Sequence, residues 1–248
     1  MKVLEIAKQA ASEAIDIAQR FLSDAHVLSA EQKDIKTLAD AEMNDIITQR
    51  LLETGIPVFS EEKHEMVMPD ECWIVDPLDG TYNFSRQFPC AAVSICLWKN
   101  GEPVCGVIQD IFKGDIFCFS EDEKASRNAG PLRVSKVSTI KNATLATGFP
   151  SGADYATDSL LAFVKSVQSF KKIRAIGSAS LMLANVAAGI FDVYYEKDIY
   201  IWDVAAGIGL IRKAGGRIYL ERNSDSHKYS VLASNSHVFE EAKKILIG

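Results

Sequence analysis

Two carboxylates follow directly after an apolar run in the stretch Trp73–Phe84, which reads WIVDPLDGTYNF. The apolar run predicts a buried strand that ends at Asp76, where Pro77 removes a backbone donor and kinks the chain. Because Asp76 and Asp79 would then lie close together, their like charges repel unless a positive group lies between them. Turn chemistry alone requires only one of the two carboxylates. The stretch therefore predicts a strand end that holds a cation.

The overall charge of the chain limits where that cation can come from. The 248 residues carry a formal net charge of −6 at pH 7, and no block rich in Lys and Arg occurs. This balance argues against a nucleic-acid-binding protein, which would normally present a basic face. An anionic substrate would need local positive charge from another source, and a metal ion is the simplest one.

The chain has the features of a cytoplasmic globular protein. Its composition is 48% hydrophobic and 24% charged, as in ordinary folded domains. No stretch approaches the roughly 18 apolar residues that a membrane span needs, and the segment Met1–Phe21 lacks the apolar centre of a signal peptide. The five cysteines are odd in number and form no CxxC pair. We expect reduced, buried thiols and no binding to membranes.

The first half of the chain combines helices with an antiparallel sheet. Apolar residues at three- and four-residue spacing predict a helix over Leu4–Leu22 and another that begins near Asp40. Asn100 and Gly101 separate two strand-like runs, which is a strong hairpin signal, and a third strand is expected at Asp115–Ser120. The two helices are expected to cover one face of this meander.

The second half alternates strands and helices, as α/β folds do. We therefore expect two regions: residues 1–134, an α+β half that carries most of the predicted metal ligands, and residues 135–248, an α/β half that carries Asp203 and the substrate contacts. No internal repeat or linker occurs between them, so the two halves should share a large interface.

Acidic residues also lie at the ends of other predicted elements. Asp40 and Asp203 begin predicted helices, where an N-cap role explains each of them equally well. Mg²⁺ prefers carboxylate and carbonyl oxygens, so Asp76, the Leu78 carbonyl and Asp79 could bind it from one side. Glu61, which follows a short predicted strand, could close the site.

A site of this kind points to phosphoryl transfer. Two metal ions can activate a water and stabilise the leaving oxygen of an in-line displacement. The backbone amides of Gly80 and Thr81 could cradle a phosphate. Other phosphate chemistries lack their motifs: the chain has no GxxxxGK[ST] loop, no Cys followed six positions later by Arg, and no Asp-x-Asp pair at this site.

At these residues the chain resembles the inositol monophosphatase family. Trp73–Phe84 closely resembles the first signature of the family, and Ile201–Gly207, with Ala214–Gly216 behind it, is similar to the second. Lesser matches run through most of the chain, at Phe59–Glu62, Phe88–Ser94, Ile176–Ser180, Tyr194–Glu196 and Ala233–Asn235.

The resemblance implies a fold, a reaction and a set of site residues. The fold is an α+β layered αβαβα sandwich, and the activity is Mg²⁺-dependent, lithium-sensitive hydrolysis of phosphate monoesters, often by a homodimer. Two or three Mg²⁺ ions would be held by Glu61, Asp76, the Leu78 carbonyl, Asp79 and Asp203. Glu61 and Thr81 would position and deprotonate the attacking water, with Asp40 supporting Thr81. Substrate would contact Asp79, Gly80, Thr81, Ser178, Ala179 and Glu196.

The details of the motifs leave the substrate open. The ending Tyr82-Asn83-Phe84 favours inositol 1-phosphate or a related polyol or sugar monophosphate, although Ser178 stands where many relatives carry Thr. The alternative is a 3′(2′),5′-bisphosphate nucleotidase or a fructose-1,6-bisphosphatase with the same mechanism. Lys33 could contact phosphate or be an ordinary surface lysine. A non-catalytic interaction protein would have lost ligands of the set, and none is lost.

Overall fold

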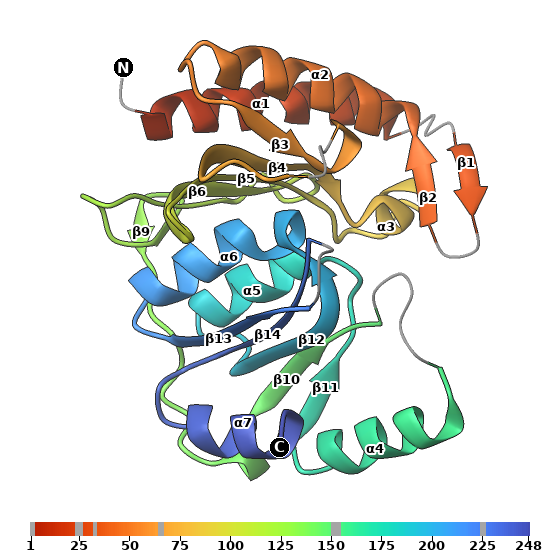
Figure 1. The fold of residues 1–248 in the computed structure, drawn as a ribbon, viewed down its shortest axis with the longest axis vertical. Helices are drawn as coiled ribbons and strands as arrows, with labels where there is room; N and C mark the ends of the chain where they lie inside the picture. Colours follow the sequence, from red (N-terminus) through yellow and green to blue (C-terminus); the bar gives the residue numbers. More distant parts are fainter. Residues whose placement is uncertain (1–2, 23–26, 32–33, 64–66, 150–154, 224–226) are drawn as a thin grey trace.

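The chain folds into alternating layers of helix and sheet. The structure is a computed structural model that describes residues 3–22, 27–31, 34–63, 67–149, 155–223 and 227–248. Figure 1 shows helices α1 and α2 over a first sheet, α5 and α6 between the two sheets, and α4 and α7 beyond the second sheet. This order confirms the expected layered α+β sandwich. The helices are α1 Val3–Phe21, α2 Leu38–Leu52, α3 Thr81–Ser85, α4 Thr157–Val167, α5 Ala179–Ala187, α6 Ile201–Lys213 and α7 Phe239–Leu246.

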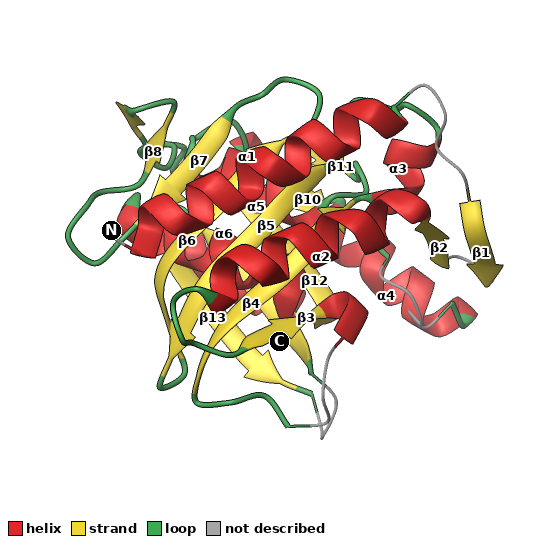
Figure 2. Cartoon of the chain, turned by 90° about the horizontal axis from the view of Figure 1, so that it is seen from above, coloured by secondary structure: helices red, strands yellow, loops and turns green. Residues whose placement is uncertain are grey.

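The first sheet contains the predicted meander. Its strands follow one another in chain order, and all neighbours are antiparallel except β3 and β4, which are parallel. Figure 2 shows α1 and α2 lying across one face of this sheet, as expected. The strands are β3 Val58–Ser60, β4 Glu71–Asp79, β5 Ala92–Lys99, β6 Glu102–Asp110, β7 Ile116–Phe119, β8 Ser126–Arg127 and β9 Gly130–Pro131.

The helices lie close to the sheet because the side chains between them are small. Ala7, Ala11 and Ala14 of α1 are fully buried, and larger side chains such as Met43 and Trp73 fill the same apolar cluster. Small residues on one helix face let its backbone approach the strands, so apolar area is buried without leaving cavities. This packing fixes the outer face of β4.

The second sheet has the strand order β11-β10-β12-β14-β13 and mixes both pairings. β10 is parallel to β11 and β12, whereas β14 is antiparallel to β12 and β13. The central apolar cluster joins Ile74 and Phe119 of the first sheet to Tyr194 and Ala233 of the second through α5 and α6. The division at residue 134 stays a prediction. The strands are β10 Thr144–Thr147, β11 Lys172–Arg174, β12 Val193–Tyr200, β13 Arg217–Arg222 and β14 Lys228–Ser234.

The prediction that the buried strand ends at Asp76 is wrong. β4 runs on to Asp79, and its pairing with β5 is irregular between Asp76, which faces Ser94, and Asp79, which faces Ala92. Three steps along β4 thus correspond to two along β5, which is one extra residue and so a β-bulge. Side chains three positions apart point to opposite faces of a regular strand. The bulge corrects this, so both carboxylates can face one site.

Four local features were not predicted from the sequence. A hairpin of β1 (Val27–Glu31) and β2 (Asp34–Thr37) precedes α2, and the short helix α3 follows β4. α2 begins at Leu38, so Asp40 lies within its first turn rather than at its cap. Asp203 likewise lies in the first turn of α6, after Ile201 and Trp202.

Gly209 is where α6 packs most closely against the first sheet. A β-carbon at this position would overlap the ring of Phe119 on β7. We expect Gly209→Ala to lower the free energy of unfolding by about 1–3 kcal/mol, because the extra methyl overpacks the interface. Urea denaturation measures this change. Phe119→Leu in the same chain should restore part of it, and an unchanged midpoint in the single variant would contradict the prediction.

Candidate active site

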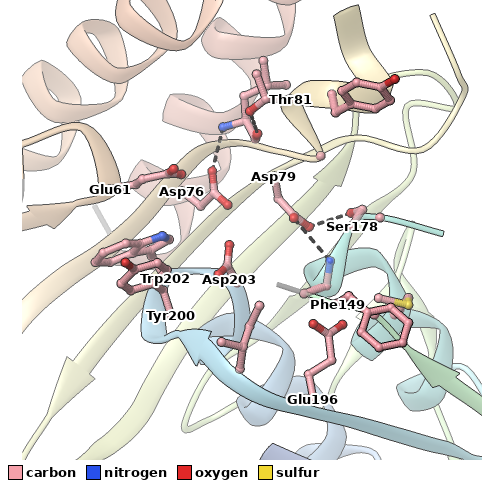
Figure 3. A pocket seen from close by; sticks show the side chains of 18 residues that line it. Glu61, Asp76, Asp79, Thr81, Phe149, Ser178, Glu196, Tyr200, Trp202 and Asp203 are labelled. Atoms are coloured by element: carbon pink, nitrogen blue, oxygen red, sulfur yellow. Dashed lines mark hydrogen bonds between the residues drawn. The ribbon is translucent and has the colours of Figure 1, made fainter. Parts of the chain in front are cut away.

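A cavity of about 320 Å³ opens where β4, β12 and the first turns of α5 and α6 come together. Figure 3 shows carboxylates from these separate elements pointing into it. Every site residue predicted from the sequence lines the cavity except Asp40, which is buried behind Thr81. Lys33 lies outside the described residues. The cavity-lining members of the predicted set are Glu61, Asp76, Leu78, Asp79, Gly80, Thr81, Ser178, Ala179, Glu196 and Asp203.

Three of these carboxylates form a compact group. Asp76, Asp79 and Asp203 can each place an oxygen within 4.8 Å of the others. Asp76 and Asp79 are 1% and 6% exposed, and Asp203 is partly buried. The bulge in β4 supplies the first two, and the first turn of α6 brings the third from far along the chain. Glu61 approaches from the short 3₁₀ turn Glu61–Lys63 that follows β3.

This group concentrates negative charge in a buried place. Burial raises the pKa of Asp76 well above its ordinary value, and the nearby carboxylates of Glu61, Asp79 and Asp203 raise it further. Burial likewise raises the pKa of Asp203, with Asp79 and Glu61 adding to the effect. No ion pair between described residues includes any member of the Asp76, Asp79 and Asp203 group. Oxygen donors that lack a positive partner fit a hard divalent cation such as Mg²⁺.

Asp79 also holds the start of α5. Its carboxylate accepts hydrogen bonds from Ser178 Oγ at 2.6 Å, from the Ser180 amide at 2.8 Å and from the Ala179 amide at 3.3 Å. The Ser180 hydroxyl donates to the same carboxylate. Burial raises the pKa of Asp79 and these bonds oppose the rise. Sequence reasoning assigned no role to Ser180, although its motif was recognised, because only the fold brings it to Asp79.

The turn after β4 positions Thr81. Gly80 has a φ of 87°, and a β-carbon there would lie 2.8 Å from the Cys90 carbonyl oxygen. Both facts require glycine. The Thr81 hydroxyl lies 2.9 Å from the Leu78 carbonyl oxygen and 3.2 Å from Asp40 Oδ1, and it can donate its hydrogen to either. The predicted link between Asp40 and Thr81 is therefore present in the geometry.

Glu196 and three aromatic side chains also line the cavity. Glu196 on β12 is 4% exposed, and burial raises its pKa to about 8. Tyr200 and Trp202 stack with ring centroids 4.4 Å apart beside Asp76 and Glu61, and Phe149 lies beside Glu196 (Figure 3). Sequence reasoning gave these three aromatic residues no role, since an uncharged ring carries no signal of its own. Only the motif Ile201–Gly207, which contains both Trp202 and Asp203, could have indicated that Trp202 lies at the site.

The family model described as the inositol monophosphatase family matches residues 1–246. The chain belongs to the inositol monophosphatase family. It is therefore a phosphoric monoester hydrolase, as the motifs around Asp76 and Asp203 predict.

Relatives of this family resemble the chain over about four-fifths of its length. The chain is 36% identical over 212 residues to an inositol-1-monophosphatase of Caulobacter vibrioides, which covers 82% of this chain and 83% of that one. It is 35% identical over 209 residues to the Nus factor SuhB of Xylella fastidiosa, with 83% and 76% covered.

Solved structures of the family share the fold. The extragenic suppressor protein suhB from Bartonella henselae superposes with a TM-score of 0.89 at 31% identity, covering 100% of this chain and 99% of that one. The inositol monophosphatase from an Anabaena (Nostoc) species gives 0.84 at 29% identity, with 98% and 94% covered.

Two further expectations concern the chain as a whole. All five cysteines are buried and free, as expected of reduced thiols. Within the described ranges, none of the helices combines the length and the apolar character needed to cross a bilayer.

Proposed function

We propose that this member of the family is a Mg²⁺-dependent phosphatase for inositol 1-phosphate or a related polyol or sugar monophosphate. The observation that carries the metal part is the group of Asp76, Asp79 and Asp203, three close carboxylates joined to no basic residue by an ion pair in the described part of the chain. The substrate part is supported by the relatives that are named inositol-1-monophosphatase.

The donor set fits Mg²⁺ in kind, because all of its atoms are oxygens. Asp76, Asp79, Asp203, Glu61 and the Leu78 carbonyl would hold two or three ions. Bound Mg²⁺ would supply Lewis-acid polarisation of the phosphoryl oxygens and would neutralise charge in the transition state. The acidic chain itself offers little else to attract an anion.

The residues beside this group would prepare the attacking water. When the Thr81 hydroxyl donates to Asp40 Oδ1, 3.2 Å away, its lone pairs are left to accept a hydrogen bond from a water in the cavity and so orient it. Glu61 lines the same cavity and can take up the proton that the water loses as it attacks phosphorus. The backbone amides of Gly80 and Thr81 would bind the phosphate oxygens.

The hydrogen bonds at α5 limit how Ser178 can meet a substrate. Its hydroxyl hydrogen is donated to Asp79, and its oxygen receives the Leu181 amide at 3.4 Å. Ser178 could therefore only accept a hydrogen bond from a substrate hydroxyl. Glu196, which lines the same cavity, would be the main polar contact for the alcohol part of the substrate.

A comparison of substrates tests the proposal. We expect kcat/KM for inositol 1-phosphate in Mg²⁺ to exceed that for adenosine 3′,5′-bisphosphate and fructose 1,6-bisphosphate by about 10-fold or more, as pocket contacts usually discriminate. Activity should disappear in excess chelator. A preference for either bisphosphate would replace the proposed substrate with the corresponding alternative, and full activity without divalent cations would remove the metal role.

Three further properties are proposed from the family resemblance. We expect a cytoplasmic homodimer that lithium inhibits. Light scattering of the purified protein measures whether it is a dimer. A lithium titration at fixed Mg²⁺ measures the inhibition.

A further inference from the structure

A second cavity lies directly beside the active-site cavity. It measures about 330 Å³ and is lined by α4, β12 and the end of α7, through residues such as Leu160, Phe163 and Leu246. Gly148, Phe149 and Glu196 line both cavities. These three residues therefore form the wall between them.

Within this wall, Gly148 lies directly against the Glu196 carboxyl. β10 ends at Thr147, which pairs with Tyr195 on β12, and the Thr147 hydroxyl donates to the Tyr195 carbonyl at 2.7 Å. The next residue on each strand is Gly148 and Glu196. A β-carbon on Gly148 would lie 2.8 Å from Glu196 Oε1, 3.1 Å from Cδ and 3.2 Å from Oε2. All three atoms of the carboxyl group thus lie against the glycine.

The backbone gives no reason for a glycine at this position. Gly148 is absent from the glycines with positive φ, unlike Gly80 and Gly177, so an L-residue can adopt its conformation. What excludes a side chain is the space that the Glu196 carboxyl occupies. The carboxyl is the far end of a flexible side chain. Alanine should therefore displace Glu196 and leave the strands in place.

Both cavities border the Glu196 side chain and offer it space to move. It is 4% exposed, and the fully buried Tyr194 lies beside it on β12. Burial raises the pKa of Glu196 to about 8, and the nearby Tyr194 hydroxyl partly opposes this rise. The Tyr194 hydroxyl itself has no hydrogen-bond partner of normal geometry among the described residues. Figure 3 shows the carboxyl pointing into the active-site cavity, on the side opposite Thr81.

We propose that Gly148 determines specificity: its missing side chain seats the Glu196 carboxyl as a polar wall that closes the active site toward the second cavity. This inference rests on the proposed phosphatase function. With the wall in place, the alcohol part of the substrate meets a carboxyl and must be small and hydroxylated. Without it, the two cavities join, and the alcohol part meets Phe149 and Phe163, whose rings pack edge to face at 5.0 Å. Larger apolar alcohols would then fit.

The test compares two phosphate monoesters on a set of variants. Inositol 1-phosphate represents a polyol, and 1-naphthyl phosphate represents a bulky apolar alcohol. We expect Gly148→Ala to lower kcat/KM for inositol 1-phosphate about tenfold, mainly through KM, as the loss of one polar contact does. The value for 1-naphthyl phosphate should stay equal or rise. Glu196→Ala should shift the ratio in the same direction, and the double variant should add little to either single one.

Gly130→Ala is the matched control. Gly130 lies in the exposed β8–β9 hairpin, also has no positive φ, and a β-carbon there would meet only the Arg127 carbonyl oxygen, at 3.3 Å. Its kinetic ratio should equal that of the unaltered protein. Equal losses on both substrates in Gly148→Ala, or an unchanged ratio, would overturn the inference.

A crystal structure of Gly148→Ala gives a readout that does not depend on activity. We expect a displaced Glu196 carboxyl and an intact Thr147–Tyr195 hydrogen bond. A carboxyl that stays in place while the strands separate would overturn the inference. If the unaltered protein hydrolyses neither monoester in Mg²⁺, the proposed function fails, while the position of the carboxyl still decides the role of Gly148.

Discussion

Replacing Asp203 with Asn is expected to lower kcat/KM in Mg²⁺ by roughly 10²–10³-fold while making the metal-free protein more stable. The two effects share one cause. Asp203 can place an oxygen within 4.8 Å of both Asp76 and Asp79. Burial raises the pKa of all three carboxyls, and neighbouring negative charge raises those of Asp76 and Asp203 further. Asn keeps the size of the side chain and removes one charge, so repulsion falls and so does the affinity for a divalent cation.

Asp203 is a cleaner choice for this experiment than Asp79. Asp79 accepts hydrogen bonds from Ser178, Ala179 and Ser180, so its replacement would also loosen the start of α5. The measurements are steady-state kinetics and thermal unfolding, the latter in chelator and again in Mg²⁺. Asp16→Asn, on the exposed face of α1, removes an equal charge far from the site and should change neither. Near-normal turnover, or a less stable metal-free variant, would show that Asp203 has another role.

Asp76 and Asp79 could be predicted as a cation site because they lie three positions apart along the chain. Asp76, Asp79, Gly80 and Thr81 lie in one short stretch, from the bulged end of β4 to the start of α3, and each residue type suits its task by itself. Asp203 came from the resemblance of its surrounding motif, since an N-cap explained it equally well. The structure brings these residues to one cavity, and the roles given to them stay predictions.

The remaining features depend on contacts that no local pattern contains. The bulge in β4 arises from pairing with β5, so the sequence alone favoured a strand that ends at Asp76. Ser180 and Gly148 acquire their contacts only when α5 meets β4 and when β10 lies beside β12. A glycine without positive φ looks like any small residue until the carboxyl that fills its space is known. The carboxylates could therefore be predicted from the sequence, whereas the residues that position them were found only in the tertiary structure.

The metal-free protein is expected to lose stability as the pH rises from about 5 to 8. Burial raises the pKa of Glu196 to about 8, and it also raises the pKa of Asp76, Asp79 and Asp203. Between the ordinary values and the raised ones, the folded state keeps protons that the unfolded state has released. Unfolding therefore releases protons, and a higher pH favours it. The loss should amount to a few kcal/mol, because one pKa unit corresponds to about 1.4 kcal/mol.

Mg²⁺ should cancel most of this loss, since a cation among the carboxylates favours their charged forms. A ligand that binds only the folded state at 100 times its Kd stabilises it by about 2.7 kcal/mol. Urea titrations at pH 5, 6, 7 and 8, in chelator and in Mg²⁺, separate the two contributions. Glu196 is not among the proposed metal ligands, so the slope that persists in Mg²⁺ should belong to it and should vanish in Glu196→Gln. If the stability of the metal-free protein instead rises with pH, the carboxylates already have positive partners. That result would contradict the proposed metal site at Asp76.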